Sequence, residues 1–213
     1  MAYPRYDSFK YLYPPRPEFI LSYDRISFYE RMGWFGQYKK NGTCTILALS
    51  PSGDFTAMTR HAEAHKQWEM NASLKKSLRS ILPQGEWIVL VSELLHNKTV
   101  SIKNTLYIHD ILVYNSEYLL GSTLKSRQVI LDKILPYHDE EYSHYVLDPN
   151  NKLWRAKNFT KDILKQFQSI TDPKIDEGIV LKDPTGKLSL CDKPDSNKSW
   201  QAKVRYATKN YSF

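Results

Sequence analysis

The sequence predicts a mixed α+β domain built on largely antiparallel sheets that are flanked by helices. Three observations support this fold class. Short runs of β-branched and aromatic residues are joined by turn-forming residues, and only a few segments carry apolar residues at helical spacing. Strands and helices also do not alternate regularly, as they would in a parallel βαβ sheet.

The expected strands cover residues 43–50, 54–59, 87–95, 105–114, 177–182, 187–191 and 200–206. The segments PSGD at 51–54 and DPTGK at 183–187 have the composition of hairpin turns. The expected helices cover 62–82, 124–135 and 160–170, and Ser122-Thr123 supplies an N-cap for the second of these. Residues 1–25 contain YPPRP and are expected to form an extended segment laid over the domain, because each proline removes a backbone donor.

Composition favours a single domain spanning residues 1–213. The chain has a mass of 25.0 kDa and is 41% hydrophobic, which is enough for one sizeable core. It has no apolar run of about 18 residues and no secretion signal, so we expect a cytoplasmic or nuclear protein that neither spans a membrane nor is exported. Cys44 and Cys191 form no CxxC pair, so we expect two free buried thiols. The net charge of +7 would steer a polyanion to the surface, although charge alone identifies no site.

The segment GQYKKNGTCTI, residues 36–46, has two interpretations. Asn41-Gly42 between two possible strands is typical of a type I′ hairpin, with Lys39 and Lys40 as solvated flanks. Alternatively, one of the two lysines is a nucleophile and Gly42 allows the backbone to approach a substrate closely. Neither a P-loop nor a GxGxxG motif occurs, so a nucleotide would have to bind without either of them.

The residues that follow along the chain favour the second interpretation. Charged side chains recur at strand ends or strand centres, namely Arg60, Glu93, Asp110, Glu177, Lys182, Lys203 and Arg205. A carboxylate in the apolar strand around Glu93 costs free energy unless it is paired, which favours a functional role. Asp110 could equally be a structural carboxylate that satisfies backbone donors. His61 and His65 lack the HExxH order of a zinc protease and are expected to be solvated or to face phosphate.

This ordered set resembles the covalent nucleotidyltransferase superfamily of ATP-dependent DNA ligases, RNA ligases and mRNA capping enzymes. KKNG at 39–42 matches the KxxG motif, TR at 59–60 resembles the arginine motif, and SELL at 92–95 resembles GEL. LYIHDILVYNSEYLLGSTLKSRQ, starting at residue 106, resembles a continuous stretch of DNA ligases. EGIVLK at 177–182 matches the fourth motif without a substitution, and KVR at 203–205 stands where the family has KxK. The resemblance implies an ATP-grasp-like adenylation domain that uses ATP with Mg²⁺ or Mn²⁺.

The resemblance also implies a role for each matched residue. Lys39 would form lysyl-AMP, with Lys182 and Lys203 as the other catalytic lysines. The nucleotide would be bound by Gly42, Arg60, Glu93, Arg205 and an adenine stacker that is either His109 or Tyr107, and the metal by Glu177, Glu93 and Asp110. These residue types suit the chemistry. Neighbouring cations lower the pKa of an attacking lysine and neutralise the α-phosphate as pyrophosphate leaves.

The expected function is an ATP-dependent DNA ligase of repair or replication that seals nicks between a 5′-phosphate and a 3′-hydroxyl. RNA ligase is the second candidate, because Asn41 and Cys44 depart from the KxDGxR motif of DNA ligases. Capping guanylyltransferase is the third, and a non-catalytic nucleic-acid-binding module is the alternative from another class. Only eight residues follow Arg205, so the family's OB domain is expected to be absent. The expected partners are a nicked DNA or RNA duplex and a protein that replaces the missing OB clamp, with no membrane.

Overall fold

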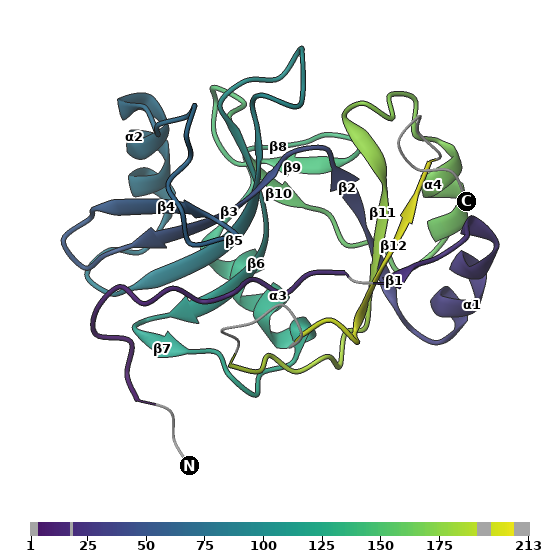
Figure 1. Ribbon diagram of the computed structural model, residues 1–213, viewed down its shortest axis with the longest axis horizontal. Coiled ribbons are helices and arrows are strands. Elements are labelled where there is room, and N and C mark those ends of the chain that lie inside the picture. The colour runs from purple at the N-terminus through teal and green to yellow at the C-terminus, as the bar shows by residue number, and fades with distance from the viewer. Residues whose placement is uncertain (1–3, 18, 191–196, 207–213) are drawn as a thin grey trace.

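Two sheets lie side by side and form the body of the molecule (Figure 1). The computed structural model describes residues 4–17, 19–190 and 197–206, and within them the larger sheet has eight strands and the smaller has four. The larger sheet has the order β4 (Phe55–Thr59), β3 (Thr43–Leu49), β5 (Ile88–Leu95), β6 (Thr105–Tyr114), β10 (Leu153–Ala156), β9 (His144–Val146) and β8 (Asp139–Glu140), with β7 (Glu117–Tyr118) paired to β6. The smaller sheet has the order β1 (Phe19–Ile20), β12 (Gln201–Arg205), β11 (Asp176–Lys182) and β2 (Phe35–Lys40).

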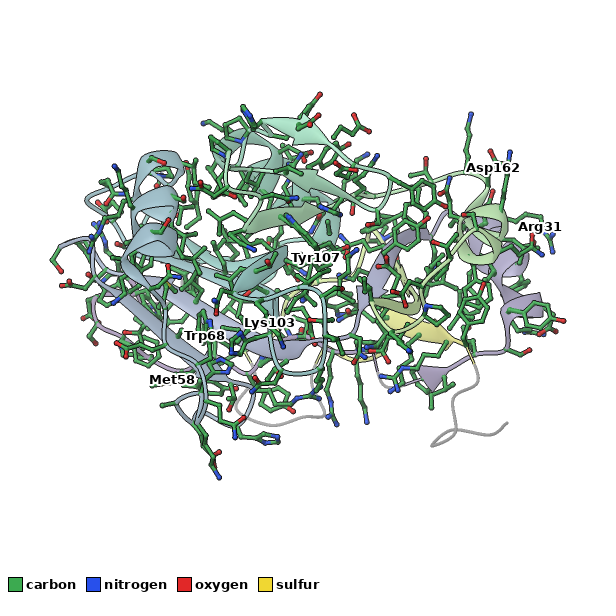
Figure 2. The ribbon with its side chains drawn as sticks, turned by 90° about the horizontal axis from the view of Figure 1, so that it is seen from above. Arg31, Met58, Trp68, Lys103, Tyr107 and Asp162 are labelled. Atoms are coloured by element: carbon green, nitrogen blue, oxygen red, sulfur yellow. The ribbon has the colours of Figure 1, made fainter. Side chains whose placement is uncertain are left out.

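The strand directions confirm the expected α+β class with largely antiparallel sheets. Among the described strands, β1 runs parallel to β12 and β10 runs parallel to β6, while the other pairs run antiparallel. Figure 2, seen from above, has Tyr107 near the centre of the molecule. Met58 and Trp68 lie on the side of the larger sheet, and Arg31 and Asp162 lie on the side of the smaller one.

Helices pack against both sheets (Figure 1). Helices α2 (Ala72–Ile81) and α3 (Leu124–Ile134) pack against the larger sheet in the main apolar core. Helices α1 (Ile26–Arg31), which follows a 3-10 helix at Tyr23–Arg25, and α4 (Ile163–Gln168) pack against the smaller sheet. Within the described segments, no helix is both long enough and apolar enough to cross a membrane.

The opposite face of the larger sheet is covered by the N-terminal segment. Side chains alternate along β3, so Leu47 and Leu49 face the helices, whereas Ile46 and Ala48 face the other way. Tyr6 and Leu12 of the N-terminal segment pack in this second cluster. Residues 4–17, which we call the strap, therefore run across the larger sheet towards the smaller one (Figure 1).

Several expected elements are confirmed, and the expected N-cap is found at Thr123. Its side chain accepts a hydrogen bond from the amide of Ser126 at 3.2 Å. The expected strands 43–50, 54–59, 87–95, 105–114, 177–182 and 200–206 correspond to β3, β4, β5, β6, β11 and β12, and the expected helix 124–135 corresponds to α3. Gly53, at φ +85°, lies in the turn between β3 and β4.

The expected helices at 62–82 and 160–170 are both too long. Helix α2 begins only at Ala72, because Asn71 caps it and the chain before it turns at Ala62, where φ is +59°. Helix α4 begins at Ile163, whose amide donates to the Glu30 carboxylate at 2.9 Å. The start of α2 is therefore set by a local cap, whereas a tertiary contact with Glu30 sets the start of α4.

The expected strand at 187–191 is wrong for the residues that the structure describes. Lys187 makes an isolated bridge with Thr123, residues 188–190 have no regular structure, and Cys191 lies outside the described residues. DPTGK does form a turn, with the Gly186 amide donating to the Asp183 carbonyl at 3.1 Å. The partner of β11 is β12, so this turn does not join a hairpin.

Candidate active site

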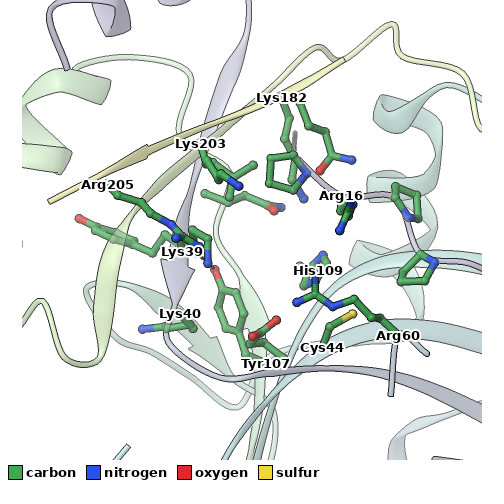
Figure 3. Close-up of a pocket in the computed structure, with 18 residues that line it drawn as sticks. Arg16, Lys39, Lys40, Cys44, Arg60, Tyr107, His109, Lys182, Lys203 and Arg205 are labelled. Carbon is green, nitrogen blue, oxygen red and sulfur yellow. Dashed lines mark hydrogen bonds between the residues drawn. The ribbon is translucent and has the colours of Figure 1, made fainter. Parts of the chain in front are cut away.

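A cavity of about 230 Å³ opens between the two sheets and the strap (Figure 3). The strap lines it with Pro14, Pro15, Arg16 and Pro17, and the segment just after β4 lines it with Arg60. The smaller sheet contributes Gln37, Tyr38, Lys39, Lys40, Val180, Lys182, Gln201, Lys203 and Arg205. The larger sheet contributes Cys44, Glu93, Tyr107 and His109. Positive charge dominates these walls. The cavity is therefore suited to a polyanionic ligand.

Lys39 lies on β2 and points towards a carboxylate of the neighbouring strand. Its Nζ forms an ion pair with Glu177, and both side chains are about one-fifth exposed. The same carboxylate interacts with Arg205 on β12, with 3.4 Å between Nε and Oε2. Three adjacent strands of the smaller sheet thus bring Lys39, Glu177 and Arg205 together.

Gly178 makes this approach of three strands possible. It stands opposite Lys39 on β2 and opposite Arg205 on β12, next to an irregularity in the β2–β11 register. Its φ is +148°, and a Cβ there would lie 1.9 Å from the Val204 carbonyl oxygen. The glycine of the EGIVLK segment is therefore required by backbone packing at the site.

Lys40 makes quite different contacts from its neighbour. Its side chain is 1% exposed, and its Nζ lies 2.8 Å from an Asp176 oxygen and donates to Ser143 Oγ at 2.7 Å. It also lies over the rings of Tyr107 and Trp154. Burial lowers the pKa of Lys40, and the attraction of Asp176 opposes this. Lys40 is thus a buried, fully engaged cation, whereas Lys39 is accessible from the cavity.

Two further lysines crowd the cavity with positive charge. Lys182 is buried, and this burial lowers its pKa to about 8, opposed by the attraction of Asp110. Burial also lowers the pKa of Lys203, and the like charges of Arg205, Lys39 and Arg16 add to the effect. Such like-charge crowding is unfavourable in the protein alone and is relieved when an anion enters.

Glu93 on β5 faces the cavity beside Gly42. Burial raises the pKa of Glu93, and the attraction of Lys39 and Lys98 opposes it. A Cβ on Gly42 would lie 2.6 Å from Glu93 Cγ and 2.7 Å from the Leu94 carbonyl oxygen. The absence of a side chain at position 42 therefore lets the chain pass against β5 on its way between the sheets.

The aromatic residues and Arg60 line the part of the cavity nearest the larger sheet. The Tyr107 hydroxyl donates to the Tyr38 carbonyl oxygen at 3.1 Å. Burial, with a smaller contribution from Lys182, lowers the pKa of His109 to about 3, so its imidazole is neutral at physiological pH. The Arg60 backbone carbonyl accepts a hydrogen bond from the Tyr11 hydroxyl of the strap at 2.5 Å.

Asp110 does not line the cavity. Its two carboxylate oxygens accept hydrogen bonds from Nε and Nη2 of Arg127, at 2.9 Å and 3.0 Å, and one of them also accepts from the Ile111 amide at 2.8 Å. Burial acts to raise the pKa of Asp110, but the attraction and hydrogen bonds of Arg127 outweigh it and hold that pKa below its usual range. These contacts favour the structural alternative for Asp110 over a role as a metal ligand.

A second cavity, of about 450 Å³, adjoins the first and shares Arg60 and Cys44 with it. Its walls are the loop after β4 and the end of β5, with the cationic side chains of Lys66 and Lys98. His61, His65 and His96 also line it, and Glu63 is its acidic residue. This arrangement adds positive charge beside the first cavity.

The structure thus gathers most of the residues singled out by the motif order. One cavity is lined by Lys39, Arg60, Glu93, Tyr107, His109, Lys182, Lys203 and Arg205. Glu177 is held at its edge by Lys39. Arg16, which also lines the cavity, was not predicted from the motif order. The only sequence signal for it was an arginine enclosed by prolines in a segment expected to cross the domain.

Two carboxylates could hold a divalent cation here: Glu93, which lines the cavity, and Glu177, which is paired with Lys39 at its edge. Among the described residues, no group of three or more His, Cys, Asp or Glu side chains could hold a metal without further ligands. Mg²⁺ is commonly held by one or two carboxylates together with substrate phosphates. The donor set therefore fits Mg²⁺ that arrives with a nucleotide.

Comparison with known proteins supports the fold at low sequence identity. The sequence matches no protein-family model and no curated protein. The ligase domain of M. tuberculosis LigD aligns with a TM-score of 0.60 and 13% identity, over 90% of this chain and 59% of that one. Mycobacterial DNA ligase D complexed with ATP and MES aligns with a TM-score of 0.56 and 14% identity, over 81% of this chain and 54% of that one. An archaeal ATP-dependent RNA ligase aligns with a TM-score of 0.50 and 13% identity, over 90% of this chain and 48% of that one.

The chain spans between about half and three-fifths of the length of these structures. DNA and RNA ligases are equally distant from it in sequence, so the comparison establishes the fold and does not separate the two substrates. The expected superfamily resemblance is confirmed at the level of the fold. The chain has the fold of the nucleotidyltransferase domain of ATP-dependent DNA and RNA ligases.

Proposed function

We propose that this protein is an ATP-dependent polynucleotide ligase that acts through a lysyl-AMP intermediate at Lys39, with nicked DNA as its preferred substrate. The observation that carries the proposal is the pairing of Lys39 with Glu177 at the edge of a cationic cavity lined by Lys182, Lys203 and Arg205. An accessible lysine among cations suits attack on a phosphate.

In the first step the neutral Lys39 amine attacks the α-phosphorus of ATP. A P–N bond forms, the bond from the α-phosphorus to the bridging oxygen breaks, and the electron pair leaves with pyrophosphate. Glu177 orients the Lys39 amine through their ion pair, and the proton that the amine loses on attack passes to solvent. Lys182 and Lys203 offset the negative charge that develops on the phosphates. Bound Mg²⁺, held by Glu93 and Glu177 with the phosphates, would supply further charge neutralisation.

In the second step an oxygen of the polynucleotide 5′-phosphate attacks the same phosphorus. The P–N bond breaks, and Lys39 recovers a proton as the adenylylated end forms. The 3′-hydroxyl then attacks the 5′-phosphate and AMP leaves, which closes the phosphodiester. The second cavity, which meets the first at Arg60 and carries Lys66 and Lys98, supports an acceptor strand at this position.

The test is incubation with α-labelled ATP and, in parallel, α-labelled GTP. We expect an acid-labile label from ATP on the wild type and none on Lys39→Ala. Lys125→Ala, at an exposed position on α3, is the matched control and should label normally. Labelling of Lys39→Ala, or no labelling of the wild type, would refute the lysyl-AMP proposal. Labelling by GTP alone would indicate a capping guanylyltransferase.

Sealing assays on nicked all-DNA and RNA-containing duplexes then decide the substrate. RNA ligase remains the second candidate, because Asn41 and Cys44 replace the aspartate and arginine of the DNA-ligase motif. If the acceptor is held through its phosphates, affinity for the nicked duplex should fall steeply with salt.

A further inference from the structure

The strap is firmly anchored before it reaches the nucleotide cavity. Tyr6 is completely buried, and its amide donates to the Ser116 carbonyl oxygen at 2.8 Å. Leu12 and Tyr13 are also buried. The Tyr11 hydroxyl joins the strap to the backbone of Arg60, which itself lines the cavity. The strap is therefore part of the folded wall of the site.

The last part of the strap, residues 14–17, carries one cation into the cavity. Three prolines fix the backbone around Arg16, because the proline ring restricts φ and removes a backbone donor. Figure 3 shows Arg16 on the side of the cavity away from Lys39, near Lys182. Its guanidinium is thus held on the wall that faces the nucleophile.

The charge environment of Arg16 is unusual for an arginine in a folded site. No acidic side chain within residues 4–17, 19–190 and 197–206 forms an ion pair with it, and its charge contributes to the lowered pKa of Lys203. Two like charges close together cost free energy in the protein alone. A phosphate group between them would convert that repulsion into attraction.

The in-line geometry of the reaction identifies which phosphate group would lie beside Arg16. In a phosphoryl or nucleotidyl transfer, the attacking and leaving atoms lie roughly in line on opposite sides of the phosphorus. With Lys39 as the attacking group, the leaving pyrophosphate points away from β2, towards the opposite wall. Arg16 and the prolines of the strap form that wall.

We propose that Arg16, carried by the N-terminal strap, binds the β- and γ-phosphates of ATP and thereby acts in lysyl-AMP formation and not in nick sealing. The planar guanidinium suits bidentate contact with phosphate oxygens. This inference rests on the proposed function for the reaction in which Arg16 acts. The binding contact itself can be measured without catalysis.

The test compares ATP and AMP binding to the whole chain by calorimetry, in wild type, Arg16→Ala and Arg16→Gln. Removing a charge-assisted contact should weaken ATP binding about tenfold to a hundredfold. AMP binding should change less than twofold, because AMP lacks both outer phosphates. Lys10→Ala removes an exposed strap cation that pairs with Asp7, outside the cavity, and is the matched control. It should leave both affinities unchanged.

A kinetic measurement on the same variants separates the reaction steps. Arg16→Ala should slow lysyl-AMP formation from ATP and weaken the binding of pyrophosphate in the reverse reaction. Sealing of a nick that is already adenylylated should proceed at the wild-type rate. Equal weakening of ATP and AMP, or equal slowing of both steps, would overturn the proposal, as would unchanged ATP affinity in both arginine variants.

The two proposals fail in distinguishable ways. If the wild type binds ATP but forms no lysyl-AMP, the proposed ligase function fails, whereas the ATP-to-AMP comparison still tests Arg16. If lysyl-AMP forms normally in Arg16→Ala and in Arg16→Gln, the ligase function stands and the role of Arg16 is refuted. A melting temperature measured without nucleotide should not be lower for either variant than for the wild type, because Arg16 forms no ion pair with the described residues and its repulsion with Lys203 is relieved.

Discussion

Replacing Lys40 should destabilise the protein while leaving its chemistry intact, the reverse of the effect expected at Lys39. We choose Lys40→Met, because methionine keeps most of the aliphatic volume of the side chain and creates little cavity. The change leaves Asp176 without the cation that lies 2.8 Å from it, and Ser143 without its donor at 2.7 Å.

The magnitude follows from burial. Removing one partner of a buried ion pair costs about 3–5 kcal/mol. The Lys40 side chain is 1% exposed but that of Asp176 is 18% exposed, so part of the penalty is relieved by solvent. We expect a loss of about 2–4 kcal/mol. Lys39→Ala should cost less than about 1 kcal/mol, because Lys39 is partly exposed and Glu177 keeps its contact with Arg205.

The loss in Lys40→Met should also depend on pH. Burial raises the pKa of Asp176, and removing Lys40 raises it further. A carboxyl group whose pKa is higher in the folded state takes up protons on folding, so its penalty grows as pH rises through that pKa. The destabilisation should therefore be larger at pH 7 than at pH 5.

Urea denaturation at both pH values measures the free energies of unfolding. Labelling with α-labelled ATP measures lysyl-AMP formation, at a temperature where Lys40→Met and Lys39→Ala are both folded. The double variant Lys40→Met with Asp176→Asn should recover part of the lost stability, because the unpaired charge is gone. If folded Lys40→Met fails to label while Lys39→Ala labels, the assignment of the two lysines is reversed and the reasoning fails.

Four further outcomes follow from other contacts. Gly178→Ala should lower the unfolding free energy by about 3 kcal/mol or more, measured by urea denaturation, because its Cβ would meet the Val204 carbonyl oxygen at 1.9 Å and a positive φ. Glu30→Ala should cost about 1 kcal/mol by removing the cap of α4, with lysyl-AMP formation unchanged. Lys182, with a pKa of about 8 against 10.5 when unfolded, binds fewer protons in the folded state, so its contribution to stability should rise with pH between those values. ATP affinity should fall above about pH 8 as Lys182 loses its charge, and calorimetry of Lys182→Arg should show no such fall.

The sequence predicted the central strands well because their side chains alternate between two buried faces. β5 and β6 are long runs of apolar and aromatic residues, and packing on both faces leaves no other conformation for them. Short strands were missed. β10, at Leu153–Ala156, has four residues and is held by its pairing with β6, a contact that no local pattern encodes.

The candidate site shows the same division between local and tertiary information. Of the charged residues that the motif order singled out, Lys39, Arg60, Glu93, Lys182, Lys203 and Arg205 line one cavity. The motif order carried no information on side-chain direction. The roles of Asp110 and Lys40 depend on Arg127 and Asp176, which are distant in sequence. Arg16 was missed for the same reason, because only the path of the strap brings it to the cavity.

The path of the chain at Asn41-Gly42 explains why the two lysines differ. β2 pairs with β11 in the smaller sheet, whereas β3 pairs with β4 and β5 in the larger one, so the chain changes sheets here and forms no hairpin. Neither Asn41 nor Gly42 has the positive φ that a type I′ turn requires. A strand that ends at a crossing between sheets has a solvent-accessible cavity on one side and packed protein on the other. Successive side chains of a strand point to opposite sides, so the Lys39 amine reaches Glu177 at the edge of the cavity. Lys40 also lines the cavity, but its amine is buried against Asp176 and Ser143 and anchors the crossing.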